Sequence, residues 1–253
     1  MALLKDQPIS CLTEWMAYDS KLSILSAQET TSIEAKSRLA QNEIETQVTS
    51  FVLRHSGLSE SAARQLPGKV TVTEALERWH SMLTLSLFYA DLASLQNSTL
   101  HRDQSRYYDM KAEAAKDQLF DTGLGIVNLP VPRPANPTIV STPGASAHRI
   151  LRGRICFVGT DGAVGAPSSE FLLDMSQGQT LAVSVTDLPA WVSGWLLFVG
   201  DGSEALYLAT PAAIAAATAI EITAVMPNQS AAILNPDAQP PDRFIRYSTD
   251  IWR

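Results

Sequence analysis

The first half of the chain alternates apolar and polar residues with the period of an α-helix. Between Ser32 and His55 the apolar residues recur at steps of three, four and seven, with charged residues at the positions between them. This spacing places the apolar residues on one face of a helix. A second such segment begins at Thr73 and continues to about Leu95, and its apolar set is wider than a single stripe. We therefore expect it to be the most buried helix of a bundle.

Shorter helical patterns lie on either side of these two segments. Residues 10–28 are typical of one or two short helices with Asp19 between them. Residues 102–121 again place apolar residues on one face, and Gly123 and Gly125 are expected to end that helix. The pattern predicts an all-helical bundle over residues 1–127, which we interpret as the assembly domain.

Residues 128–137 break the helical pattern with four of the fourteen prolines of the chain. Proline fixes its own φ angle and biases the preceding residue toward extended backbone. Such a segment is a semi-rigid spacer. It predicts a linker and a domain boundary.

After the linker, short apolar runs separated by Pro, Gly, Asp and Ser replace the helical period. The seven runs are TIVST, RILRGRICFVG, SEFLLDM, TLAVSV, WLLFVG, ALYLAT and AIEITAV. Short strands at spacings near a dozen residues, with no helical pattern between them, are typical of an antiparallel sandwich. We predict an immunoglobulin-like or fibronectin type III-like β-sandwich over residues 138–225. The expected fold class is α+β multidomain, with a helical bundle followed by this sandwich.

One loop of the predicted sandwich has glycines at a spacing that suggests a nucleotide site. Gly159, Gly162 and Gly165 lie three residues apart, but no Lys-Ser or Lys-Thr follows them and the spacing is not GxGxxG. The next segment has the pattern of a strand, whereas phosphate motifs lead into a helix N-terminus. We interpret the glycines as turn residues between strands.

Two tryptophans lie at the start of a predicted strand. Trp191 and Trp195 are most simply large apolar side chains that fill the core of a small sandwich. The alternative is that one of them stacks on a carbohydrate ligand. In that case the domain would be a surface-adhesion or carbohydrate-binding module on a helical base.

The segment from residue 226 to residue 253 forms a proline-rich arm that ends in RFIRYSTDIWR. Each large apolar side chain in it would gain about 1.5–3 kcal/mol from burial. We predict that this arm docks on another domain or on a neighbouring subunit. The candidate assembly contacts are Phe244, Ile245, Tyr247, Ile251 and Trp252.

Composition and charge exclude several classes of partner. The formal net charge is −7, so the chain lacks the basic surface that tight contact with a nucleic-acid phosphate backbone requires.

No signal peptide and no membrane-spanning segment is expected. Asp6 and Pro8 interrupt the apolar start of the chain. The Ala-rich run before residue 225 contains Pro211 and Glu221, which a membrane-spanning helix would not favour.

Residues that carry chemistry are few and scattered. The four histidines form neither HxxxH nor HExxH, and Cys11 and Cys156 are far apart and are interpreted as two buried free thiols. His80 is expected to be a hydrogen-bonded core histidine. No GxSxG motif or defensible Ser/His/Asp set occurs. We expect no catalytic, metal or cofactor-binding residues, and a protein that is not an enzyme.

Taken together, the two halves resemble a family of virion proteins. The matching pieces are the Leu-Glu-Arg-Trp-His run at 76–80, Arg106-Tyr107 with Lys111, the Thr-Gly-Leu-Gly-Ile run at 122–126, the proline spacer, and the sandwich that carries GTDGAVGAPSSEF. Their order over residues 10–225 resembles neck proteins of tailed bacteriophages, of the head-to-tail connector, adaptor or collar type. In these proteins a helical domain precedes an immunoglobulin-like or fibronectin type III-like module.

This resemblance implies a structural role in the virion, with assembly in the host cytoplasm. It implies a homo-oligomeric ring between portal and tail proteins, with the helical domain facing the channel or neighbouring subunits and the sandwich projecting outward. DNA would at most pass through the channel of such a ring. The acidic composition is compatible with that arrangement because it weakens adhesion to DNA.

Overall fold

The structure is a computed structural model of the chain, which divides into two compact units, one of helices and one of sheets. It describes residues 3–6, 9–28, 31–55, 59–144, 147–201, 205–210, 212–215, 218–222, 232–234 and 239–246. The helical unit contains Leu3–Asn128 and the chain from Pro241 onward, and the sheet unit contains Leu129–Pro240. The chain therefore leaves the helical unit at Asn128 and returns to it at Pro241. An α+β layout, with helices first and antiparallel sheets after them, is confirmed.

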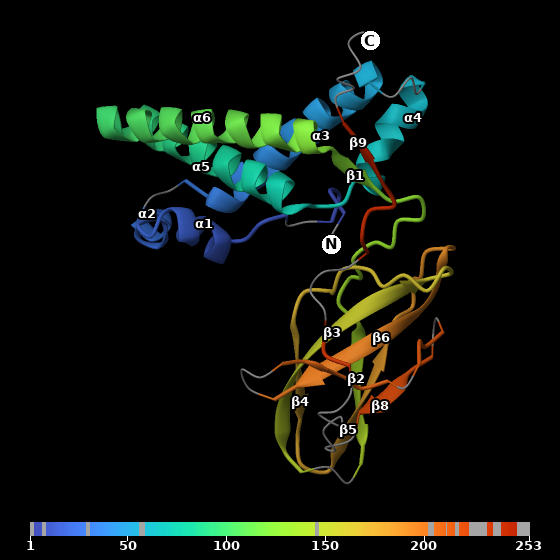
Figure 1. The fold of residues 1–253 in the computed structure, drawn as a ribbon. Coiled ribbons are helices and arrows are strands. Elements are labelled where there is room, and N and C mark those ends of the chain that lie inside the picture. Colours follow the sequence, from blue (N-terminus) through green and yellow to red (C-terminus); the bar gives the residue numbers. More distant parts are fainter. Residues whose placement is uncertain are drawn as a thin grey trace. The chain divides into compact units, whose positions relative to one another are not determined.

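The helical unit contains the helices that the apolar period predicts (Figure 1). The predicted helices are α1 (Leu12–Tyr18), α2 (Leu22–Gln28), α3 (Ile33–His55), α5 (Glu74–Gln96) and α6 (Thr99–Thr122). The structure adds α4 (Glu60–Gln65) and the 3-10 turn η1 (Leu66–Lys69), which the sequence pattern does not predict. Asn97 ends α5 in the left-handed conformation with φ of 47°, and Ser98 then caps α6 by accepting a hydrogen bond from the backbone N–H of His101. This tight turn sends α6 back along α5, so the two helices pack against each other over their length.

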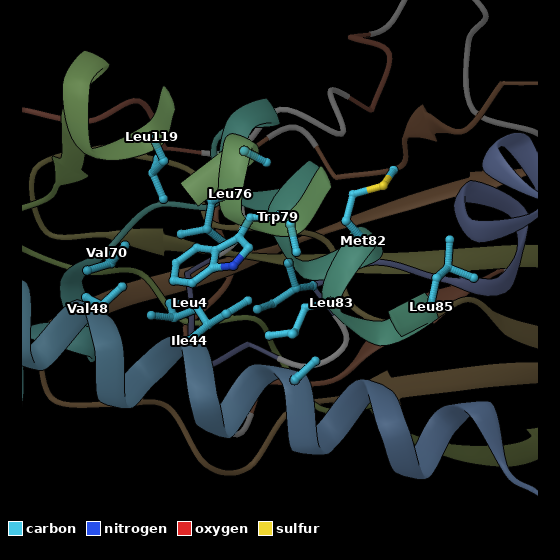
Figure 2. Close-up of a cluster of buried hydrophobic side chains, with 14 of the residues drawn as sticks. Leu4, Ile44, Val48, Val70, Leu76, Trp79, Met82, Leu83, Leu85 and Leu119 are labelled. Atoms are coloured by element: carbon cyan, nitrogen blue, oxygen red, sulfur yellow. The ribbon is translucent and has the colours of Figure 1, made fainter. Parts of the chain in front are cut away.

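Helix α5 is the most buried helix of the unit, as its wide apolar face predicts. Its Trp79 is almost completely buried, and Figure 2 shows the indole surrounded by side chains that include Leu4, Ile44 and Leu76. These side chains come from the N-terminal segment, from α3 and from α5. Burying an aromatic side chain of this size is one of the largest single apolar contributions available to a small core.

A short two-stranded sheet lies at the C-terminal end of α6. Strand β1 (Leu124–Ile126) pairs antiparallel with β9 (Arg243–Ile245). Ile126 also bridges to Val70, and Leu3 bridges to Thr71. The segment around residues 70–73 is too short in sequence to predict as a strand, and it joins the N-terminal segment to β1.

The sheet unit contains two antiparallel sheets built from the seven predicted runs (Figure 1). The strands are β2 (Thr138–Pro143), β3 (Arg149–Gly159), β4 (Phe171–Met175), β5 (Gln179–Ser184), β6 (Val192–Gly200), β7 (Tyr207–Leu208) and β8 (Ile220–Ile222). One sheet has the order β2-β5-β8 and the other has the order β4-β3-β6-β7. The chain crosses repeatedly between the two sheets, because strands that follow one another in sequence belong to different sheets at several points.

Both sheets contribute side chains to one core. Leu151 and Trp195 from one sheet and Val183 and Ile222 from the other belong to the same buried cluster. Alternate residues of β3 therefore face inward, as the strand pattern predicts. The immunoglobulin-like or fibronectin type III-like type of this arrangement stays a prediction.

The glycine loop after β3 is a turn, and the segment that follows it leads into strand β4. Gly162 has a φ of 83°, and the N–H of Gly159 donates to the carbonyl oxygen of Ala163 at 2.8 Å. A Cβ at Gly165 would lie 2.7 Å from Cγ1 of Val131. The glycines thus allow the backbone to turn and to pack closely against Val131. No helix begins at this loop, so no helix N-terminus could bind a phosphate there.

The proline-rich segment is held against the sheet unit at its start. Val131 belongs to the sheet core, and its N–H donates to Oε1 of Gln239 at 3.1 Å. The amide nitrogen of Gln239 donates to the carbonyl oxygen of Leu129 at 2.8 Å. Residues 129–131 are therefore part of the sheet unit rather than of a free spacer.

Candidate functional site

The described part of the C-terminal arm docks on the helical unit. Ile245 packs against the helical core, while Phe244 is half exposed. Asp242 holds the start of the arm in two ways, since its N–H donates to the carbonyl oxygen of Ile126 at 2.9 Å and its Oδ2 accepts the N–H of Asn128 at 2.7 Å. Strand pairing and these bonds join the arm to the chain at the end of α6.

Three of the five candidate assembly residues, Tyr247, Ile251 and Trp252, lie outside the described residues. Their contacts stay a prediction. Of the two that the structure places, Phe244 is half exposed, and Ile245 is partly buried against the helical core.

The two tryptophans of the sheet unit have opposite environments. Trp195 is 0% exposed and lies in the shared core of the two sheets, so neither face of its ring is open to a ligand. Trp191 is 45% exposed, and its indole nitrogen donates to the carbonyl oxygen of Pro130 at 2.7 Å. Of the two stacking candidates, only Trp191 therefore offers a surface.

A cluster of hydrogen bonds around Asp19 joins α5, α6 and the turn between α1 and α2. The hydroxyls of Tyr89 and Tyr108 both donate to Oδ2 of Asp19, the second at 3.4 Å, and the N–H of Lys21 donates to Oδ1 at 3.0 Å. Burial, together with the Asp19 carboxylate, raises the pKa of Tyr108 to about 12 and raises that of Tyr89 further. Both tyrosines are therefore neutral donors at physiological pH.

A cavity of about 640 Å³ lies next to this cluster and is lined by Tyr18, Ile24, Leu100 and His101 as well as by Asp19. Ile24 is 58% exposed, Leu100 is 65% exposed, and Tyr18 is half exposed. We call these three side chains the apolar rim. The rim brings α1, α2 and α6 together at the end of the bundle that contains the α5–α6 turn.

Sequence reasoning did not find the apolar rim or the Asp19 cluster. In the sequence, Asp19 is typical only of a break between two short helices. Its tyrosine partners are 70 and 89 residues away, and no local pattern connects positions so far apart. The only indication of this cluster in the sequence is the presence of the two tyrosines, because a buried Tyr usually needs a hydrogen-bond partner for its hydroxyl.

A second buried network surrounds His80. The hydroxyl of Ser10 lies 2.6 Å from Nδ1 of His80, Nε2 of His80 lies 3.0 Å from the carbonyl oxygen of Ser37, and the indole nitrogen of Trp15 donates to the Ser10 oxygen at 2.7 Å. One tautomer satisfies every bond, with the proton on Nε2 and the Ser10 hydroxyl donating to Nδ1. The expected core histidine is thus hydrogen-bonded on both ring nitrogens.

This Ser–His pair is better suited to structure than to catalysis. Burial lowers the pKa of His80 to about 4, although the bond to the Ser37 carbonyl and the charge of Glu14 oppose the shift. A general base works best with a pKa near the operating pH, and this imidazole is a weak base. The Ser10 oxygen is also already an acceptor for Trp15 and is almost fully buried.

The cysteines differ from the expectation of two buried thiols. Cys156 is buried, and burial raises the pKa of its thiol to about 12. Cys11 is exposed, which corrects that part of the prediction. It lies at the N-cap of α1, where the chain is at the surface.

Within the described ranges, no group of three or more His, Cys, Asp or Glu side chains is placed to hold a metal ion. No helix among the described residues combines the length and the apolar character that a membrane crossing needs. Comparison of the chain with protein-family models, with curated proteins and with solved structures finds no match. The features that remain as candidates for function are the apolar rim, the C-terminal arm and the exposed face of Trp191.

Proposed function

We propose that the chain is a structural virion protein of a tailed bacteriophage, a subunit of the head-to-tail connector or neck ring. The helical unit carries the contacts to neighbouring subunits, and the sheet unit is displayed as a separate module. Portal and tail proteins are the proposed partners. The order of a helical unit followed by a module of two antiparallel sheets supports this proposal, as does the resemblance of the matching sequence pieces.

The observation that carries the proposal is the apolar rim around the 640 Å³ cavity. Large contiguous apolar patches on the surface of a soluble protein often mark a site of contact with a partner. Interface cores are also enriched in aromatic and apolar side chains with polar groups around them. The rim supplies the aromatic and apolar side chains of such a contact in Tyr18, Ile24 and Leu100, and these surround the polar Asp19 cluster rather than being surrounded by polar groups.

The position of the rim at one end of the bundle is compatible with a ring of identical subunits. A contact between unlike surfaces of identical subunits generates a closed ring when the rotation between neighbours closes. The rim lies at the α5–α6 turn, while the docked arm lies at the opposite end of α6. The helical unit thus has two different ends, which a head-to-tail contact requires.

Replacing both Ile24 and Leu100 by Asp is expected to abolish self-assembly, because two charges would be placed in the centre of the proposed contact. The measurement is light scattering of the purified chain, with negative-stain images to detect rings. Leu39→Asp is the matched control, since Leu39 is 53% exposed on α3 and does not line the cavity.

Assembly that survives in the double variant would contradict the assignment of the rim as the subunit contact. A wild-type chain that stays monomeric under every condition tested would contradict self-assembly itself. Circular dichroism of each variant checks that the helices remain folded.

The exposed face of Trp191 favours a second candidate function, adhesion to carbohydrate. The bond from its indole nitrogen to Pro130 holds the ring in place, and a held aromatic face is a suitable stacking surface for a sugar. Glycan-array binding that is lost in Trp191→Ala with folding retained is the expected result for this function. Binding that is absent from the wild-type chain, or unchanged in the variant, would exclude the Trp191 surface from this role.

A further inference from the structure

The outward side of the docked arm carries Phe244 and Arg246. Successive side chains of a strand point to opposite sides, and Ile245 of β9 packs against the helical core. Phe244 and Arg246 flank Ile245 in the sequence and therefore lie on the other side. Phe244 is 51% exposed, and Arg246 is exposed as well. We call these two side chains the arm face.

Glycines at β1 leave the arm face open. Gly125 of β1 is the register partner of Phe244. Gly123 directly precedes β1, and a Cβ there would lie 3.0 Å from Cβ of Phe244 and 3.4 Å from Cβ of Arg246. Because neither glycine has a side chain, neither covers the arm face. Arg246 forms no ion pair with any described residue, so the arm face combines an aromatic ring with a cation that has no acidic partner there.

The cavity inside the apolar rim offers the complementary charge. The Asp19 carboxylate lines this cavity, and its hydrogen-bond donors are the hydroxyls of Tyr89 and Tyr108 and the backbone N–H of Lys21, which are all neutral. The Lys21 side chain also lines the cavity, but no cation among the described residues forms an ion pair with Asp19. A partly buried carboxylate held only by neutral donors favours a cationic hydrogen-bond donor.

The arm face and the rim cavity match in composition. The rim places Ile24 and Leu100 around Asp19, and the arm face places Phe244 two residues from Arg246. We propose that the arm face of one chain fills the rim cavity of a neighbouring copy, with Phe244 against the apolar rim and Arg246 paired with Asp19. This inference rests on the proposed ring, and it specifies the contact between its subunits.

An arm face in this cavity belongs to another chain. Pairing of β9 with β1 holds the arm face at the C-terminal end of α6. Leu100 of the rim lies near the other end of α6, about 23 residues before Gly123, which is about 35 Å at 1.5 Å per residue. The contact therefore joins unlike ends of two chains, and its repetition links chains head to tail.

Complementation between two assembly-deficient variants tests this contact on the full chain. The arm variant contains Phe244→Ala and Arg246→Glu, and the rim variant contains Ile24→Asp and Leu100→Asp. Arg243→Glu is the matched control, because Arg243 is exposed on the same strand and lies on the side opposite to the arm face. Light scattering measures the mass of each variant alone and of the two variants mixed in equal amounts.

Each variant alone is expected to be monomeric, because each lacks one side of the contact. The mixture is expected to form a complex of two chains and no larger ring, since the intact arm face of the rim variant still fits the intact rim of the arm variant. The arm variant should associate at least about 30-fold more weakly than the wild-type chain, and Arg243→Glu less than about 3-fold more weakly.

The outcomes separate this contact from the proposed ring. An arm variant that assembles as the wild-type chain does overturns the contact, and it leaves the ring intact when the wild-type chain forms one. A mixture of the two variants that stays monomeric also overturns the contact. A wild-type chain that stays monomeric contradicts the ring and the contact together.

Cross-linking between chains gives a readout that does not depend on loss of assembly. Cys11→Ser removes the exposed thiol, while Cys156 stays in place because burial raises its pKa and makes it unreactive. Chains with Ile24→Cys are then mixed with chains with Phe244→Cys and treated with a short bismaleimide. The yield of linked dimers is expected to be several-fold higher than with Leu39→Cys in place of Ile24→Cys. Equal yields overturn the proposal.

Discussion

Trp195→Ala is expected to lower the free energy of unfolding of the sheet unit by about 3–5 kcal/mol, the usual cost of truncating a buried aromatic side chain. Trp195 is completely buried between the two sheets, so the substitution leaves a cavity that both sheets line. Domain stability is about 5–15 kcal/mol in total. The variant should therefore have a sheet unit close to its stability limit.

Hydrogen exchange of the β3 and β6 amides measures this loss separately from the helical unit. Trp191→Ala is the matched control, because it truncates a partly exposed ring that makes one bond to Pro130, and its cost should be about 1 kcal/mol. Trp195→Phe should cost less than Trp195→Ala, since it keeps an aromatic ring and removes an indole N–H without a partner among the described residues. Equal losses in Trp195→Ala and Trp191→Ala would contradict this account of the core.

The helical unit is expected to lose about 3 kcal/mol of stability as the pH falls from about 6.5 to about 4, through His80. Burial lowers the folded-state pKa of His80 to about 4, from the ordinary value of 6.5. Between these two values the unfolded chain binds a proton at this residue and the folded chain does not. The stability that His80 contributes is therefore complete above pH 6.5 and is lost as the pH falls toward the folded pKa.

Urea unfolding followed by the helical circular dichroism signal, repeated across this pH range, measures the slope. His80→Gln should make the slope shallower, because the variant has no imidazole to protonate. His148→Gln is the control, since His148 is exposed at the start of β3 in the sheet unit and should not affect unfolding of the helices. A wild-type slope that matches that of His80→Gln would show that His80 does not titrate as its burial requires.

The elements of the fold were predictable because each depends on residues close together in the sequence. The period of the apolar residues located α3, α5 and α6, and Gly123 marked the end of α6. The seven short apolar runs each contain a strand. The expected hydrogen-bonded core histidine is also confirmed, because His80 lies on the buried face of the most apolar helix.

Contacts between distant residues were not predictable in the same way. The pairing of β1 with β9 joins residues about 120 positions apart, and a three-residue strand has no periodicity to detect. The Asp19 cluster and the Ser10–His80 bond likewise depend on which helices pack together. Strand alternation would place Trp191 and Trp195 on the same face, since they are four residues apart. They differ because Trp191 lies just before β6, which begins at Val192.

The sequence by itself determined where the longer helices and the seven strands of the sheet unit occur, where the pattern changes from one to the other, and which residues are candidates for burial. These properties follow from local periodicity and from the conformational preferences of proline and glycine. Only the tertiary structure decided that the arm from Pro241 returns to the helical unit, that Trp195 is enclosed while Trp191 is open, and that Tyr18, Ile24 and Leu100 surround one cavity. The physical reason is that side-chain packing selects among many long-range pairings that local patterns leave equally acceptable.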